Sequence, residues 1–217
     1  MKDGYLKEYL AEATGTFALV FAGTGAIVSN DVSSGAVTGV GVALVFGLVI
    51  MVMIYALGDI SGAHLNPAVT IGFCIARNFP VRKASGYIIA QISGVLSASI
   101  ILRLIFFHHP FLGATLPRYP VYQSVFLEFI LTFMLMFVIL NVTRGTKERG
   151  IVPGIAIGAT VGLCSLFAGP ISGASMNPAR SLAPAIISGH LEYLWIYIIF
   201  PVFGVIFACF LSRFMEV

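Results

Sequence analysis

Charged residues are scarce in this chain. Only 10% of its 217 residues are Asp, Glu, Lys or Arg, whereas a soluble domain contains about 25%. Hydrophobic residues make up 59%, and the mean hydropathy is +1.00. A soluble globular protein needs more charged residues than this on its surface. The composition therefore indicates that the protein lies in lipid.

The residues on which enzymes and metalloproteins usually depend are also few. The cysteines are three in number and widely spaced, which favours buried thiols over disulfides or a metal site. The histidines are scattered, and the chain shows no nucleophile–base pair, phosphate loop or metal-ligand cluster. An enzyme is therefore the least favoured class, and we expect no cofactor and no metal. The residues concerned are Cys74, Cys164, Cys209, His64, His108, His109 and His190.

Apolar runs, by contrast, fill most of the chain. Six runs approach the roughly 20 residues that a membrane-spanning helix needs, at 9–28, 35–57, 82–106, 122–143, 151–168 and 194–213. Two shorter runs, 67–77 and 178–187, begin at Asn-Pro, a natural helix start. At ~1.5 Å per residue they reach about half of a ~30 Å hydrocarbon core. We predict an all-α membrane protein, a single domain over 1–217 with six spans and two half-helices; buried loops or surface helices are the alternative for the short runs.

The chain also repeats itself. Residues 60–70 read ISGAHLNPAVT and residues 171–181 read ISGASMNPARS, identical at seven of eleven positions. Upstream, Glu12-x3-Thr16-Phe17 is echoed by Glu128-x3-Thr132-Phe133. We therefore predict two related halves, at about 1–110 and 120–217, inverted because each half has three spans. Such a duplication is typical of membrane transport proteins with the pathway at the repeat interface.

Lys and Arg predict the orientation in the membrane. With both termini cytoplasmic, nine of the twelve fall on the inner side and only Arg103 and Arg118 on the outer side, while Arg180 lies within the membrane. The inner loops thus account for the net charge of +3, and no nucleic-acid partner is needed. The nine are Lys2, Lys7, Arg77, Arg82, Lys83, Arg144, Lys147, Arg149 and Arg213.

The ionisable residues expected at membrane depth are Glu12, Glu128, Arg180 and His64, and each needs a partner because charge is costly in lipid. Glu12 and Glu128 occupy equivalent places, which favours a structural role in holding the non-helical backbone before each half-helix. A proton relay is the alternative. Arg180 has no counterpart, since Val69 stands at the equivalent position, and it is suited to repel cations and to donate to a polar solute. A purely structural Arg bonded to loop carbonyls is the alternative.

The two half-helices predict a pore for small neutral hydroxylic molecules. If both Asn-Pro starts meet at the bilayer centre, two positive helix ends face one spot. Asn66 and Asn177 would cap these ends while donating to whatever passes. Irregular backbone at this depth is tolerated where it lines a cavity, so the carbonyls of Gly62, Ala63, His64, Gly173, Ala174 and Ser175 would supply acceptors. Apolar residues would form the opposite wall.

These motifs resemble the aquaporin, or major intrinsic protein, superfamily. The resemblance rests on Asn66-Pro67-Ala68, on Asn177-Pro178-Ala179-Arg180-Ser181 and on the opening Ala11-Glu12-x2-Gly15-Thr16. It implies six tilted helices plus two half-helices, one pore per protomer and a homotetramer in the plasma membrane. It also implies an outer selectivity filter of four residues, which spacing from the two Asn residues assigns to Phe46, Ser165, Ala174 and Arg180.

The filter matches neither standard type in this family. Water-selective members have His where this chain has Ser165, and glycerol facilitators have Asp where it has Ser181. The phrase 168–176, together with Tyr197, resembles the nodulin-26-like branch, and the compact chain suggests a microbial member. The resemblance implies passage of water, glycerol and uncharged metalloid acids such as arsenous or boric acid, with exclusion of ions and protons. Bulky Phe46 argues against silicic acid.

Three alternatives stay open at this point. A strict water channel would result if Phe46 and Arg180 dominate the filter. A coupled secondary transporter also uses inverted repeats and half-helices, but it needs a titratable or ion-binding centre at the midplane. A structural membrane protein with a vestigial pore would need neither the Asn-Pro-Ala pair nor Arg180.

Overall fold

A computed structural model describes residues 3–143 and 152–215, and within these ranges all regular structure is helical. The predicted inner cations Lys2, Arg144, Lys147 and Arg149 lie outside the described residues. The helices are α1 Asp3–Val32, α2 Thr38–Ser61, α3 Pro67–Ile75, α4 Val81–Ile105, α5 Val121–Val142, α6 Val152–Ser172, α7 Pro178–Ser188 and α8 Leu194–Phe214.

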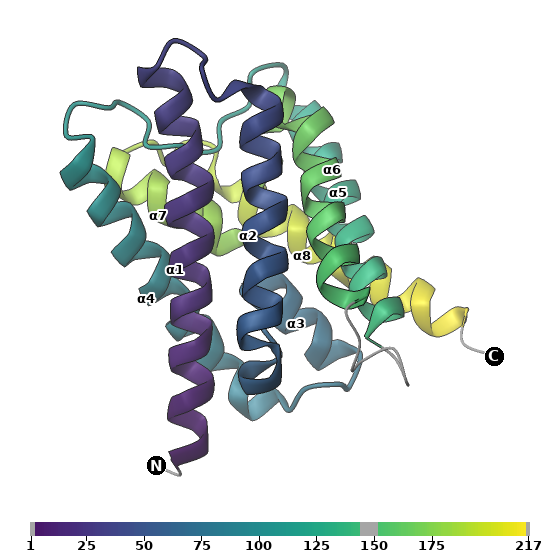
Figure 1. The fold of residues 1–217 in the computed structure, drawn as a ribbon. Coiled ribbons are helices and arrows are strands. Elements are labelled where there is room, and N and C mark those ends of the chain that lie inside the picture. The colour runs from purple at the N-terminus through teal and green to yellow at the C-terminus, as the bar shows by residue number, and fades with distance from the viewer. Residues whose placement is uncertain (1–2, 144–151, 216–217) are drawn as a thin grey trace.

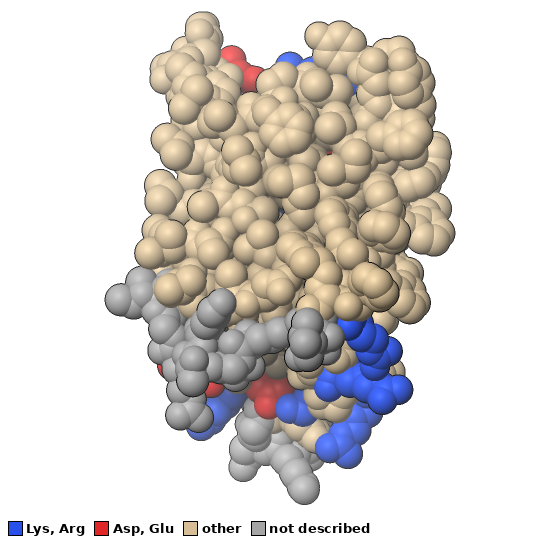
Figure 2. All heavy atoms as spheres, turned by 90° about the vertical axis from the view of Figure 1, so that its right-hand side faces the viewer, with Lys and Arg blue, Asp and Glu red and all other residues tan. Residues whose placement is uncertain are grey.

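The predicted fold is confirmed. Six of the helices are long and apolar enough to cross a membrane, and they coincide with the six predicted spans. The largest difference is at the N-terminus, where the helix begins at Asp3 instead of residue 9. Charged residues there obscure the apolar run but do not stop the helix. On the face in Figure 2, Lys, Arg, Asp and Glu gather at the two ends, with a broad uncharged band between them.

The two half-helices lie in opposite halves of the bundle. In Figure 1, α3 occupies the lower half and α7 the upper half, with the long helices around them. The long helices pair in matching ways, α1 against α4 and α5 against α8. A Cβ at Gly94 would collide with the carbonyl oxygen of Ala13, and one at Gly204 with that of Phe129. Both collisions occur one residue after the equivalent glutamates, so each half packs its first and third spans through the same close contact.

Helices α2 and α6 join the halves. A Cβ at Gly47 would lie 2.7 Å from the carbonyl oxygen of Gly158, and 3.1 Å from Cα of Gly162. Glycines thus allow the two helices to approach closely at this crossing. One turn before Gly158, Gly154 faces the ring of Tyr55.

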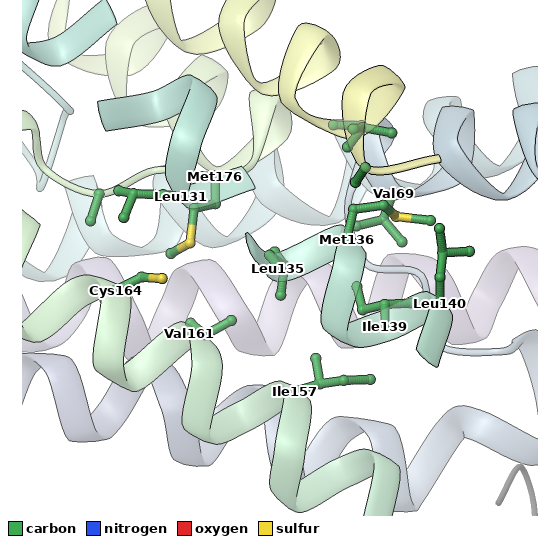
Figure 3. Packing of buried hydrophobic residues seen from close by; sticks show 14 of the residues in the cluster. Val69, Leu131, Leu135, Met136, Ile139, Leu140, Ile157, Val161, Cys164 and Met176 are labelled. Atoms are coloured by element: carbon green, nitrogen blue, oxygen red, sulfur yellow. The ribbon is translucent and has the colours of Figure 1, made fainter. Parts of the chain in front are cut away.

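The apolar core follows the inner faces of α5 and α6. Figure 3 shows Ile157 and Val161 of α6 opposite Leu135 and Ile139 of α5. These side chains are at most 8% exposed. They form a smooth apolar wall, and the irregular segments before α3 and α7 lie across from it.

Candidate transport pathway

Each half-helix begins where the sequence predicts. The Oδ1 atom of Asn66 accepts from the backbone N–H of Ala68 at 2.9 Å, and that of Asn177 accepts from Ala179 at 3.0 Å. Proline follows each Asn in the first turn, where no N–H is needed. Each half-helix is therefore capped by the Oδ1 atom of an Asn whose Nδ2 group can still donate hydrogen bonds.

The amide nitrogens link the two halves. Asn66 Nδ2 donates to the carbonyl oxygen of Met176 at 2.8 Å, and Asn177 Nδ2 donates to that of Leu65 at 2.8 Å. The exchange is reciprocal across more than a hundred residues of sequence. It brings the positive ends of α3 and α7 together in the interior of the bundle.

The segments before the half-helices have an unusual backbone. In the first, φ is +46° at Ala63 and +51° at Leu65; in the second it is +42° at Ala174 and +54° at Met176. Non-glycine residues rarely adopt this region, and such conformations persist where surrounding contacts hold them. The carbonyl oxygens of Leu65 and Met176, one from each segment, accept the bonds from the Asn amides across the bundle.

A buried carboxylate holds each of these segments. Glu12 accepts from the backbone N–H of His64 at 2.9 Å and of Leu65 at 2.8 Å, and from the Ser61 hydroxyl at 2.7 Å. Glu128 accepts from Ser175 at 2.9 Å and Met176 at 2.8 Å, and from the Ser172 hydroxyl at 3.0 Å. Both glutamates are 0% exposed. All backbone donors that they satisfy belong to the irregular segments.

The two supports differ in one partner. Gln91 Nε2 donates to Glu12 at 2.8 Å and to the Thr70 hydroxyl at 3.0 Å. At the equivalent place in the second half stands Pro201, which has no amide to give. There the hydroxyl of Ser181 pairs instead with Thr115 at 2.7 Å and Ser175 at 2.5 Å. Thr115 comes from the long connection between α4 and α5, so this connection completes the second half's network.

A cavity of about 960 Å³ runs beside these segments. It follows one face of α2 through Phe46, Ile50 and Ile54, and one face of α6 from Pro153 to Ser165. Across from these apolar faces it is lined by Asn66, Asn177 and the irregular segments. Five of the six residues predicted to offer carbonyls line it: Gly62, Ala63, His64, Ala174 and Ser175. Gly173 does not line it.

The four predicted filter residues all line this cavity. Phe46 and Ser165 lie toward the same end of their antiparallel helices, opposite the end formed by Asp59 and Pro153. Arg180 follows Asn177 by one turn of α7, is only 2% exposed, and stands with its Cζ 5.0 Å from the centre of the Phe46 ring. The four side chains therefore line one cavity, in which Arg180 and Phe46 lie close together.

Sequence reasoning missed the residues that fix Arg180. Its Nη1 donates to the carbonyl oxygen of Gly113 at 2.8 Å, while Nε has no protein partner among the described residues. Gly113 lies in the connection between α4 and α5, just after Leu112, whose N–H donates to Nδ1 of His109 at 3.0 Å. No local pattern predicts these contacts, because the partners are 67 residues apart.

Comparison with known proteins agrees with this geometry. The family description "Major intrinsic protein" matches residues 2–212. The chain is 49% identical over 203 residues to aquaporin NIP1-1 of Oryza sativa subsp. japonica, covering 93% of this chain and 72% of the relative. It is 45% identical over 203 residues to nodulin-26 of Glycine max, covering 93% and 75%.

A solved structure agrees as well. The X-ray structure of the aquaglyceroporin from Plasmodium falciparum superposes with a TM-score of 0.86 at 26% identity, over 96% of each chain. The family match covers nearly the whole chain, and the relatives confirm the resemblance to the nodulin-26-like branch. The chain therefore belongs to the major intrinsic protein family, the aquaporins.

Proposed function

We propose that this multi-pass membrane channel passes glycerol and small trihydroxy acids as well as water, and that it excludes ions and protons. The protein is a transport protein and not an enzyme. The observation that carries the proposal is the cavity's lining, with residues of the two irregular segments, Asn66 and Asn177 on the one hand and apolar side chains of α2 and α6 on the other. A hydroxylic solute can exchange its water contacts for the polar side and slide along the apolar one.

The constriction supports solutes larger than water. Ser165 and Ala174, two of its four predicted members, have small side chains and line the cavity. Arg180 keeps an Nε–H without a protein partner among the described residues, at 2% exposure. A buried donor gains from a partner, and a hydroxyl of glycerol or of arsenous or boric acid is suited to accept from it. We therefore assign Phe46, Ser165, Ala174 and Arg180 as the selectivity filter.

Ion exclusion follows from two positive features. The N-termini of α3 and α7 converge beside Asn66 and Asn177, each with about half a positive charge. Arg180 adds a full charge one turn away. A water molecule between the two Asn amides accepts from both and is oriented oxygen-first, which interrupts a proton wire. Cations meet this potential with carbonyls but no carboxylate to replace their hydration shell.

The remaining assignments concern the whole assembly. We infer that both termini are cytoplasmic, that the protein resides in the plasma membrane, and that it is a homotetramer with one pore per protomer. We also infer that residues 1–217 form a single domain, built from two repeats at about 1–110 and 120–217. The matched pairs Glu12 with Glu128 and Asn66 with Asn177 support the internal repeat.

The decisive test of class is whether transport is passive. Purified protein in proteoliposomes should let labelled glycerol equilibrate but never accumulate, whether or not a pH or Na⁺ gradient is imposed. A dye reporting internal pH, with a K⁺–valinomycin potential applied, should show proton entry no faster than in empty liposomes. Accumulation of glycerol that depends on either gradient would establish a coupled secondary transporter and would refute the channel mechanism.

A strict water channel is the second candidate. The short distance between Arg180 and the Phe46 ring favours it, because these two groups narrow the constriction from two sides. Water flux without glycerol flux in the same vesicles would establish this alternative.

A further inference from the structure

Phe46 enters the constriction from α2, and a missing side chain on α1 makes room for its ring. A Cβ at Gly23 would lie 2.6 Å from Cδ1 of Phe46 and closer still to Cε1 and Cζ. Real Cβ contacts are essentially never shorter than 3.0 Å. The ring therefore occupies space that any residue other than glycine at position 23 would fill. Gly23 is itself buried inside the bundle.

The backbone that carries Phe46 is held at the same level. The next residue, Gly47, is in close contact with α6, where a Cβ would lie 2.7 Å from the carbonyl oxygen of Gly158 and 3.2 Å from N of Gly162. Helix α2 is thus enclosed between α1 and α6 at the height of the filter. Because packed interiors transmit such pressure, a side chain at position 23 would displace the Phe46 ring before it displaced the helix.

The open space beside the ring is the cavity that it lines. Arg180 stands on that side, with Cζ 5.0 Å from the ring centre. A ring moved out of the Gly23 notch would therefore advance into the constriction between Phe46, Ser165 and Arg180.

We propose that Gly23 is a positioning residue for selectivity: its bare Cα lets the Phe46 ring sit back toward α1, and this retraction sets the width available to solutes larger than water. The inference rests on the proposed function, since it requires Phe46 to be part of the filter. It adds a position on the first helix that acts through Phe46 without contacting the solute.

The test compares G23A with G25A in proteoliposomes, measuring water and glycerol permeability on the same preparations. Gly25 lies on the same helix, but a Cβ there meets only Leu102 Cδ2, at an ordinary 3.4 Å. For G23A we expect glycerol permeability to fall about tenfold relative to water, whereas the ratio in G25A should stay at the wild-type value. A glycerol-to-water ratio in G23A equal to that in G25A would overturn the proposal.

The double variant G23A/F46A separates positioning from a general packing defect. Once the ring is absent, alanine at position 23 has nothing to push, so G23A/F46A should match F46A in both permeabilities. A ratio that G23A lowers equally with and without the ring would contradict the proposal. If G23A does not fold, F46W makes the same test, because a larger ring in the same notch must extend toward Arg180. Its glycerol permeability should fall, and wild-type or higher glycerol flux would overturn the idea.

Failure of this inference is distinguishable from failure of the proposed function. If the wild-type protein itself passes no glycerol, the proposed solute range is wrong. If the wild type passes glycerol but G23A behaves as G25A does, only the role of Gly23 is wrong.

Discussion

At the scale of single residues, we expect two small side chains to set the width of the proposed filter. In the filter that we propose, Ser165 and Ala174 are the two small members, beside the bulky Phe46 and Arg180. Ser165 contributes a hydroxyl on α6, where an imidazole would reach further into the bore. We therefore expect the solute range to depend on side-chain volume at position 165 as much as on hydrogen bonding.

Replacing Ser165 with His should narrow the filter. In S165H we expect glycerol permeability to fall about tenfold and water permeability by less than about threefold, because added volume discriminates by size. Stopped-flow light scattering on proteoliposomes measures both, and S165T serves as a control that adds only one methyl group. Glycerol permeability unchanged in S165H would show that Ser165 does not lie at the constriction.

Arg180 should contribute charge as well as a hydrogen-bond donor. In R180A we expect proton or cation leak to rise about tenfold, because the barrier from a full charge is removed. R180K keeps the charge while losing the planar donor, so its leak should stay close to wild type and its glycerol flux should fall. Equal leak in R180A and the wild type would assign ion exclusion to the half-helix ends alone.

At the scale of elements, the half-helices depend on caps and buried carboxylates, and only some of these contacts can be predicted from the sequence. The capping role of Asn66 and Asn177 follows from Asn-Pro at a helix start, and the repeated Glu12 and Glu128 point to the loops. The partners of Gln91, Thr115 and Gly113 could not be predicted, because these contacts join segments more than twenty residues apart without any local pattern. The positive φ angles in the irregular segments could not be predicted from the sequence either, because most of them fall on non-glycine residues.

The carboxylate at position 128 should be needed for the second loop. Glu128→Gln leaves one acceptor oxygen and presents an amide N–H to the N–H of Ser175 or Met176. We expect a loss of about 2–3 kcal/mol and a lower thermal midpoint in detergent, with reduced flux of water and glycerol together. Exposed Glu192→Gln is the matched control and should change neither quantity. A stable, fully conducting E128Q protein would contradict the supporting role.

The close crossing of α2 and α6 should contribute to the stability of the protein. In G47A, the new Cβ meets the carbonyl oxygen of Gly158 at 2.7 Å and must push the helices apart. We expect a loss of about 1–3 kcal/mol, seen as a lower thermal midpoint. Gly58 lies on the same helix with nothing within 4 Å of a Cβ, so G58A should keep or raise the midpoint. Equal midpoints for the two variants would argue against a close crossing.

For the whole molecule, composition and duplication carried most of the information. Scarce charge and six apolar runs predicted the bundle, and helix ends differ by a few residues except at α1, where Lys7 and Glu8 interrupt the apolar run. The inverted pair of half-helices followed from the Asn-Pro repeats. Side-chain distances at the constriction did not follow, because they depend on how closely α1, α2 and α6 approach one another.

The proposed filter admits glycerol-sized solutes as well as water. The most direct test of this selectivity is stopped-flow light scattering on one preparation of proteoliposomes, first shrunk under a sucrose gradient and then re-swollen under a glycerol gradient. We predict water and glycerol permeabilities that both clearly exceed those of empty liposomes. Fast water with glycerol at the empty-liposome rate would contradict the account, because Phe46 and Arg180 would then close the filter despite the small Ser165 and Ala174.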